Sequence, residues 1–135
     1  MRYLLDTHSL IWFQENNPRI PKRVMNEIQN PTNIIFFSQV SLFEIAIKQK
    51  IGKLPLFQVT ISEVYEQAIK DELTFLHVHN NHIEAYENVP LLPEHRDPFD
   101  RLLIATAYQE NLTILTADKN FDLYPEFIKV IWNNL

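Results

Sequence analysis

One stretch decides how this chain folds: HRDPFDRLLIA, residues 95–105. A residue before proline is pushed out of the α region, so Asp97 is the expected N-cap and Pro98 fits the first helical position. Asp100 then lies in the first turn. The apolar residues that follow are too dense for a half-exposed helix, which predicts packing against a sheet. In a purely structural interpretation, Asp97 and Asp100 only cap the helix, and Arg101 pairs with Asp97 one turn away.

Outward from this stretch, short apolar segments typical of strands alternate with helical patterns. Strands are predicted at 2–6, 34–37, 73–78, 113–116 and 128–131. Helices are predicted at 7–14, 21–29, 41–50, 60–72, 80–88 and from 97 onward. Strands separated by helices form a parallel sheet with right-handed crossovers and helices on its faces. Because no linker or repeat interrupts the pattern, the sequence predicts one three-layer α/β domain over residues 1–135.

Composition excludes several kinds of site. The chain has no cysteine, which excludes a disulfide framework, a thiolate zinc site and a cysteine nucleophile. The net charge of −5 argues against binding nucleic acid over the whole surface, although a local basic rim beside an acidic site can still hold phosphates. The first apolar run is interrupted at Asp6, too early for a signal peptide, and no later run reaches membrane-spanning length. We therefore expect a cytoplasmic protein without a membrane partner.

Acidic residues are expected at one edge of the predicted sheet. In open parallel sheets, functional groups gather beyond the carboxyl ends of the strands. Asp6 closes the first predicted strand, and Asp118 follows the fourth beside Thr116. Each has a structural interpretation, Asp6 as the N-cap of the next helix and Asp118 as a turn residue. Their arrival at one edge from distant parts of the chain, together with Glu44 and Asp100, favours a shared site.

Glu44 lies in a predicted helix whose other residues are mostly apolar. Such a helix is buried, and an ionised carboxylate within it needs a partner to offset desolvation. The structural interpretation supplies a capping box with Ser41 and an ion pair with Lys48. In the functional interpretation, the partner that offsets desolvation of Glu44 is a bound cation.

Oxygen ligands of this kind suit Mg²⁺ or Mn²⁺, which keep several waters and bind substrate phosphate as well. Such ions bind a phosphodiester, activate a water and stabilise the leaving oxygen, and in two-metal sites they lie about 3.5–4 Å apart. The residues leave open whether one ion or two would bind.

Four motifs, in this order along the chain, resemble those of PIN-domain proteins, and most closely those of VapC-type toxins. They are YLLDTH (3–8), VSLFEIAIK (40–48), HRDPFDRLLIA (95–105) and LTAD (115–118). The resemblance covers essentially the whole chain. It implies a PIN-like fold and a metal-dependent endoribonuclease that hydrolyses RNA with Mg²⁺ or Mn²⁺. It also implies a homodimer whose activity is blocked by a small cognate antitoxin protein.

The resemblance also implies roles for particular residues. The catalytic and metal-binding acids would be Asp6, Glu44 and Asp100, with Asp118 as a more variable fourth. Asp97 is left open between a helix cap, a metal ligand and a group behind the ligands. Candidate supporting or substrate-contacting residues are Thr7, His8, Lys48, Arg101 and Thr116.

The residues permit three other interpretations. Zinc is suggested by the spacing of His77, His79 and His82, but a strand-to-helix junction often carries histidines and no cysteine joins them. An aspartyl-phosphate phosphohydrolase of the haloacid-dehalogenase kind needs a second acid two residues after Asp6, where His8 stands. A non-catalytic PIN-like interaction module is favoured if the acids do not converge or bind no metal.

Overall fold

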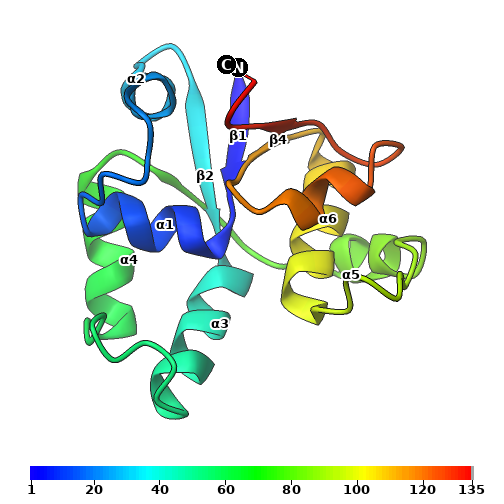
Figure 1. Cartoon of the computed structure of the whole chain (residues 1–135), viewed down its shortest axis with the longest axis horizontal. Coiled ribbons are helices and arrows are strands. Elements are labelled where there is room, and N and C mark those ends of the chain that lie inside the picture. The colour runs from blue at the N-terminus through cyan, green and yellow to red at the C-terminus, as the bar shows by residue number, and fades with distance from the viewer. Residues whose placement is uncertain (135) are drawn as a thin grey trace.

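The computed structural model describes residues 1–134 and contains a five-stranded parallel sheet of order β3-β2-β1-β4-β5 (Figure 1). The strands are β1 (Arg2–Leu5), β2 (Ile34–Ser38), β3 (Thr74–Leu76), β4 (Thr113–Leu115) and β5 (Val130–Ile131). The α-helices are α1 (Thr7–Gln14), α2 (Lys22–Gln29), α3 (Gln39–Lys50), α4 (Ile61–Lys70), α5 (Asn80–Tyr86) and α6 (Pro98–Glu110), and a 3₁₀ helix, η1 (Lys119–Leu123), follows β4. The predicted α/β class and parallel sheet are confirmed.

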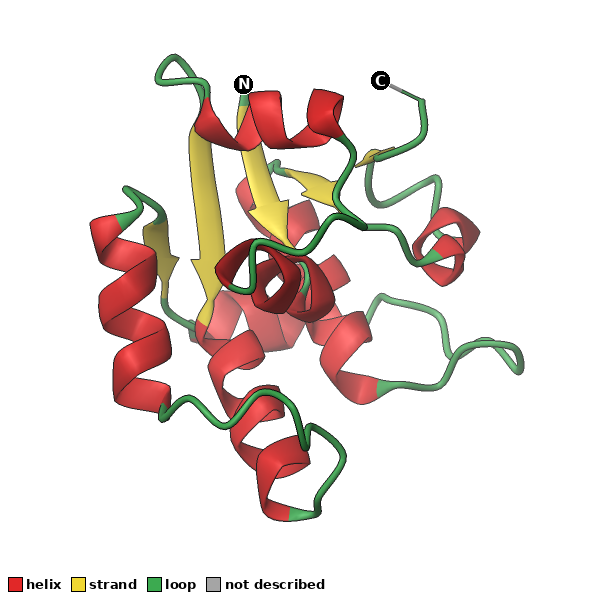
Figure 2. Ribbon diagram, turned by 60° about the vertical axis from the view of Figure 1, so that its left-hand side comes forward, coloured by secondary structure: helices red, strands yellow, loops and turns green. Residues whose placement is uncertain are grey.

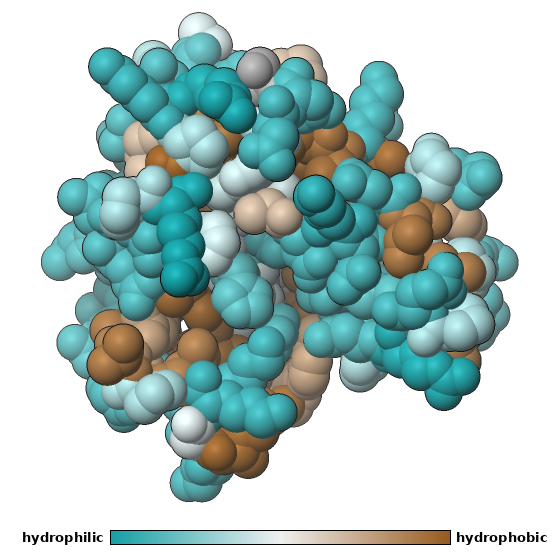
Figure 3. All heavy atoms as spheres, in the orientation of Figure 1, coloured by the Kyte–Doolittle hydropathy of each residue, from teal (hydrophilic) through white to brown (hydrophobic). Residues whose placement is uncertain are grey.

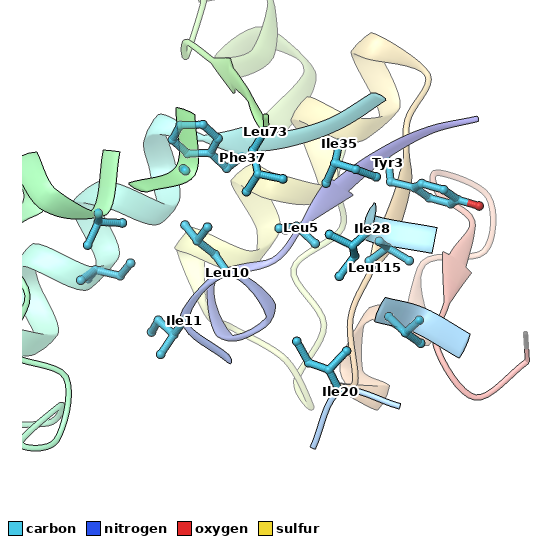
Figure 4. Close-up of a cluster of buried hydrophobic side chains, with 14 of the residues drawn as sticks. Tyr3, Leu5, Leu10, Ile11, Ile20, Ile28, Ile35, Phe37, Leu73 and Leu115 are labelled. Atoms are coloured by element: carbon cyan, nitrogen blue, oxygen red, sulfur yellow. The ribbon is translucent and has the colours of Figure 1, made fainter. Parts of the chain in front are cut away.

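Alternate side chains of β1 point to opposite faces of the sheet, as the pleat of a strand requires. Tyr3 and Leu5 belong to a core shared with α1, α2 and α4, which Figure 4 shows in close-up. Leu4 belongs to a second core, shared with α5 and α6. Helices therefore cover both faces and give three layers (Figure 2). Within residues 1–134, no helix combines the length and apolar character needed to cross a bilayer.

The carboxyl ends of β1 and β4 meet at the point where the strand order reverses. Leu5 is in register with Leu115, and the Asp6 amide donates to the Leu115 carbonyl at 3.3 Å. Asp6 and Thr116 therefore leave the sheet side by side. This is the position at which open parallel sheets place their functional groups.

The start of α3 differs from the prediction. The helix begins at Gln39, and the Ser38 side chain caps it by accepting from the Val40 amide at 3.0 Å. The predicted start at Ser41, with Ser41 and Glu44 as a capping box, is therefore wrong. The reason is that β2 runs directly into the helix, so Glu44 lies in the second turn rather than the first.

The predicted capping role of Asp97 is confirmed. Thr60 and Glu63 form a capping box at the start of α4, and Gly52, with φ of +75°, follows the end of α3. Asp97 is the N-cap of α6. The β3 strand is shorter than predicted, and η1 was not predicted because its only local signal is the capping side chain of Asp118.

Candidate metal site

Three carboxylates lie close together at the junction of α3 and α6. Glu44, Asp97 and Asp100 each offer an oxygen, and these oxygens lie within 4.8 Å of one another. The Glu44 side chain is 2% exposed, whereas the two aspartates are half-buried. Like charges this close repel, more strongly where water is excluded. The arrangement therefore favours binding of a cation.

Asp97 is both a helix cap and a member of this acidic trio. Its Oδ1 accepts from the amides of Phe99 at 2.8 Å and Asp100 at 3.2 Å. Both bonds use the same oxygen, so capping does not occupy the second carboxylate oxygen. The two roles that the sequence left as alternatives are thus compatible in one side chain.

Glu44 is held from both sides. Thr7 donates its hydroxyl to Oε1 at 2.6 Å, and the Lys48 ammonium lies 2.6 Å from Oε2. Burial by itself lowers the pKa of Lys48, but the bond to Glu44 and the charges of the two aspartates outweigh it and leave that pKa raised. The predicted Glu44–Lys48 pair is confirmed, and Lys48 supplies a tethered positive charge to the trio.

Asp6 is buried beside the trio. Its Oδ2 accepts from the Thr116 hydroxyl at 2.7 Å and its Oδ1 from the Ser9 amide at 3.0 Å, so it caps α1. Burial raises the pKa of Asp6, and these hydrogen bonds only partly counteract it. The trio of closely spaced oxygens contains Asp97 rather than Asp6, whose two oxygens accept from Thr116 and Ser9. Convergence of Asp6 with Glu44 and Asp100 on one ion stays a prediction.

The pKa of Asp100 is raised to about 7, mainly by burial and also by the charges of Asp97, Glu44 and Asp6, against a hydrogen bond from His95 that lowers it. Asp6 is therefore close enough to Asp100 for the two charges to interact. The site has the negative charge, the desolvation and the oxygen ligands that a hard divalent cation requires.

A family model described as PIN domain matches residues 3–126. This chain belongs to the PIN domain family. No curated protein matches it significantly.

Solved structures with the same fold as this PIN domain include three structures of VapBC proteins. VapBC2 from Rickettsia felis, bound to a promoter DNA fragment, gives a TM-score of 0.71 at 18% identity, over 98% of this chain and 99% of the matched chain. VapBC-1 from nontypeable Haemophilus influenzae gives 0.69 at 16% identity, over 100% of both chains. DNA-bound VapBC from Salmonella typhimurium gives 0.70 at 16% identity, over 97% of both chains. At these identities the likeness establishes the shared fold.

Asp118 is not one of the three acids in the trio of this PIN domain. It is exposed, and it caps η1 by accepting from the Asn120 amide at 2.9 Å. Its amide donates to the Thr116 hydroxyl at 3.0 Å, the same hydroxyl that donates to Asp6. Asp118, Asp6 and His8 share the lining of a pocket of about 200 Å³. Thr116 therefore links the two acids that follow β1 and β4.

Arg101 points away from the acids. Its Nη1 donates to the Tyr86 hydroxyl at 2.7 Å, and its guanidinium lies 4.6 Å from the Tyr86 ring centre. Within residues 1–134 it forms no ion pair with Asp97, so the predicted pair is wrong. The side chain packs on α5 because Tyr86 offers both a π face and a hydroxyl.

The histidines near β3 serve the junction between β3 and α5. His82 is fully buried; its Nδ1 accepts from the His79 amide at 3.1 Å, and its Nε2 lies 2.8 Å from Glu110. Both ring nitrogens are thus engaged within the protein. In the described part of the chain, the group of ligand atoms close enough for a metal is the acidic trio. The structural interpretation of these histidines accounts for their spacing.

His95 contacts this site, although no role was predicted for it from the sequence. Its Nε2 lies 3.0 Å from Asp100 Oδ2 and its Nδ1 lies 2.9 Å from the Tyr124 hydroxyl. The only local signal was its position in the motif, five residues before Asp100. Neither helical periodicity nor capping rules pair residues at that spacing across a turn, so the contact could not be predicted.

Proposed function

We propose that this PIN domain is a metal-dependent endoribonuclease and the toxin of a toxin–antitoxin pair. The observation that carries the proposal is the close approach of Glu44, Asp97 and Asp100. Membership of the PIN family and the fold shared with VapBC proteins support it.

The donor set fits Mg²⁺ or Mn²⁺. All three groups of the trio offer carboxylate oxygens, which hard divalent cations prefer, and no thiolate is available to select a softer metal. Glu44, Asp97 and Asp100 would hold the ion, with Asp6 beside them. A bound ion of this kind activates a water and stabilises the leaving oxygen of a phosphodiester.

The protein's own residues prepare this site before any ion arrives. Thr7 orients Glu44 from α1, and Thr116 orients Asp6 from the end of β4. Hydrogen-bonded carboxylates keep their position, which reduces the reorganisation needed when a ligand binds. Lys48 balances part of the negative charge in the meantime.

RNA phosphates need positive charge near an acidic site in a protein of net charge −5. Exposed basic side chains occur in or next to the segments that carry the acids: Lys50, Lys53, Arg96 and Lys119. We propose that they form a local rim that holds the phosphate backbone, because Lys and Arg contacts to phosphates dominate nucleic-acid affinity.

The proposed antitoxin needs an apolar surface. One groove of about 450 Å³ lies between α1 and the loop after α3, where Leu56 is 93% exposed. Figure 3 shows apolar side chains around the lower end of α3 and this loop. A second groove, of about 590 Å³, is lined by apolar residues of α3, α5 and α6, including Phe43 and Phe99. We propose that an antitoxin segment covers the first groove and a second copy of the chain the other.

The test of activity uses protein purified free of any partner and a mixed RNA pool, with Mg²⁺, with Mn²⁺ and with chelator. We expect cleavage only with metal, and none from Asp100→Asn. A folded protein that binds Mn²⁺ but cleaves no RNA would instead be the non-catalytic interaction module. Single-stranded DNA of matched sequence in a parallel reaction tests whether the substrate class is RNA.

A further inference from the structure

We infer that His95 and Tyr124 position the Asp100 carboxylate for metal binding, an inference that rests on the proposed metal site. Two hydrogen bonds in series lead to the acid. The Tyr124 hydroxyl lies 2.9 Å from His95 Nδ1, and His95 Nε2 lies 3.0 Å from Asp100 Oδ2. Tyr124 is thus the far end of a series of contacts that begins at an oxygen of Asp100, a member of the acidic trio.

Chemistry assigns the protons in this chain. A metal-binding carboxylate only accepts hydrogen bonds, so His95 must donate from Nε2. In the neutral imidazole Nδ1 is then the acceptor, and the Tyr124 hydroxyl is the donor to it. The acceptor-only carboxylate therefore selects the tautomer with its proton on Nε2. The Tyr124 hydroxyl, which can donate or accept, then serves as the donor to Nδ1 and holds the ring from the other side.

Packing fixes the orientation of the ring. His95 is 4% exposed and Tyr124 is fully buried. The imidazole lies against the rings of Tyr124 and Phe121, with centroids 5.7 Å and 6.1 Å away. The His95 amide also donates to the Leu92 carbonyl at 3.2 Å, which holds the loop before α6. With the ring fixed, its bond restricts the rotation of Asp100.

Tyr124 directly follows η1, which itself follows β4. The chain segment that carries Thr116 and Asp118 therefore also supports an acid on α6. Metal-binding carboxylates are commonly oriented by partners behind them, and loss of such a partner typically weakens metal binding about 10–100-fold. Loss of either hydrogen bond in the series from Tyr124 to Asp100 should therefore weaken metal binding measurably.

A second buried histidine of this protein provides a matched control. His82 is another fully buried histidine that contacts a carboxylate, that of Glu110, at 2.8 Å. Glu110 ends α6, whereas Asp100 lies in its first turn. Ten residues of helix separate these acids by about 15 Å. Loss of the His82 contact therefore perturbs a buried histidine–carboxylate pair without touching the trio.

The experiment measures Mn²⁺ binding to the full chain by titration calorimetry, without RNA. Tyr124→Phe keeps the ring and removes only the hydroxyl. We expect Tyr124→Phe and His95→Leu to weaken Mn²⁺ binding about tenfold or more. His95→Gln should restore most of the affinity, because its amide nitrogen can donate from a similar position. His82→Gln should bind as the parent does.

Two comparisons separate positioning from general damage. In an Asp100→Asn background, adding Tyr124→Phe should change Mn²⁺ affinity no further, because the carboxylate it acts through is gone. Melting in chelator shows which variants fold. If His95→Leu does not fold, Tyr124→Phe and the double variant still decide the matter.

The outcomes are distinct. Parent protein that binds no Mn²⁺ would refute the proposed metal site itself. Parent protein that binds Mn²⁺, with Tyr124→Phe binding equally well, would overturn the positioning role alone. Equal weakening in His95→Gln and His95→Leu would also overturn it, because the donor at Nε2 would then be irrelevant.

Discussion

The Lys48 ammonium lies 2.6 Å from Glu44 Oε2, so the acidic trio already contains a positive charge supplied by the chain. Lys48 is one helical turn from Glu44 and 26% exposed, which leaves it room to withdraw toward solvent. A divalent cation that binds Glu44 must compete with this ammonium. We therefore expect this pair to weaken metal binding at the proposed site.

Lys48→Met tests that competition. Removal of the ammonium leaves a buried carboxylate without its charged partner, which should destabilise the metal-free protein by about 1–3 kcal/mol. Mn²⁺ then has no competitor at Glu44, so its affinity should rise. The rise should be about tenfold for each 1.4 kcal/mol by which the ammonium had opposed Mn²⁺ binding. The measurement is thermal melting in chelator and in Mn²⁺. Lys50→Met, at an exposed neighbouring position, is the control; an unchanged Mn²⁺-induced rise in Lys48→Met would contradict the competition.

Asp100→Asn should abolish metal-dependent RNA cleavage and leave the metal-free fold as stable as the parent or more so. Two carboxylates about 4 Å apart repel by about 1 kcal/mol in water and about 4 kcal/mol at an effective dielectric of about 20. Removal of one charge relieves this repulsion. The melting temperature in chelator should therefore equal that of the parent or exceed it, by about 4 °C for each kcal/mol of repulsion that is relieved. The further rise in melting temperature on adding Mn²⁺ should be smaller than in the parent. Full cleavage by the variant would refute the catalytic assignment.

Asp97→Asn separates capping from ligation. Asparagine caps a helix about as well as aspartate, so the melting temperature in chelator should not fall, while the Mn²⁺-induced rise should shrink. Asp97→Ala loses the cap as well, so its free energy of unfolding should be about 1 kcal/mol lower than that of Asp97→Asn. If Asp97 were a cap alone, the asparagine variant would keep the full Mn²⁺ response. Melting of the two variants side by side distinguishes these cases.

Metal-free stability should fall as pH rises from about 4 to about 7. Burial, with the neighbouring acids, raises the pKa of Asp100 from 3.8 to about 7, and burial also raises that of Asp6. A carboxyl group whose pKa is raised on folding contributes stability that is complete below its unfolded pKa and lost as pH rises through its folded pKa. Denaturant unfolding in chelator across this range measures the slope. Asp100→Asn should flatten it, and an equal slope in both proteins would argue against Asp100 as its source.

Much of this fold could be predicted from residues that are close together in the sequence. The alternation of apolar strands with helices predicted the parallel sheet, and the Asp-Pro pair predicted that Asp97 caps α6. The Glu44–Lys48 pair followed from helical spacing. These features depend on residues within one turn or one strand, where backbone geometry alone brings side chains together.

The start of α3 and the membership of the trio depended on more distant structure. Ser38 caps α3 because β2 continues through it into the helix, which a local capping pattern at Ser41 concealed. Asp97 lies with Glu44 and Asp100 in the trio, whereas Asp6 bonds to Thr116, which follows another strand of the sheet. A list of acids could not rank them by distance.

The sequence by itself determined the class of fold, the main helix caps and the acids expected beyond the strands. Only the tertiary structure decided which groups hold those acids: Thr7 for Glu44, Thr116 for Asp6, and His95 with Tyr124 for Asp100. The physical reason is the separation along the chain of the residues that interact. A cap or a strand pattern is fixed by neighbours along the chain, whereas a hydrogen bond between residues 29 apart, as between His95 and Tyr124, exists only after the loop before α6 has packed on η1.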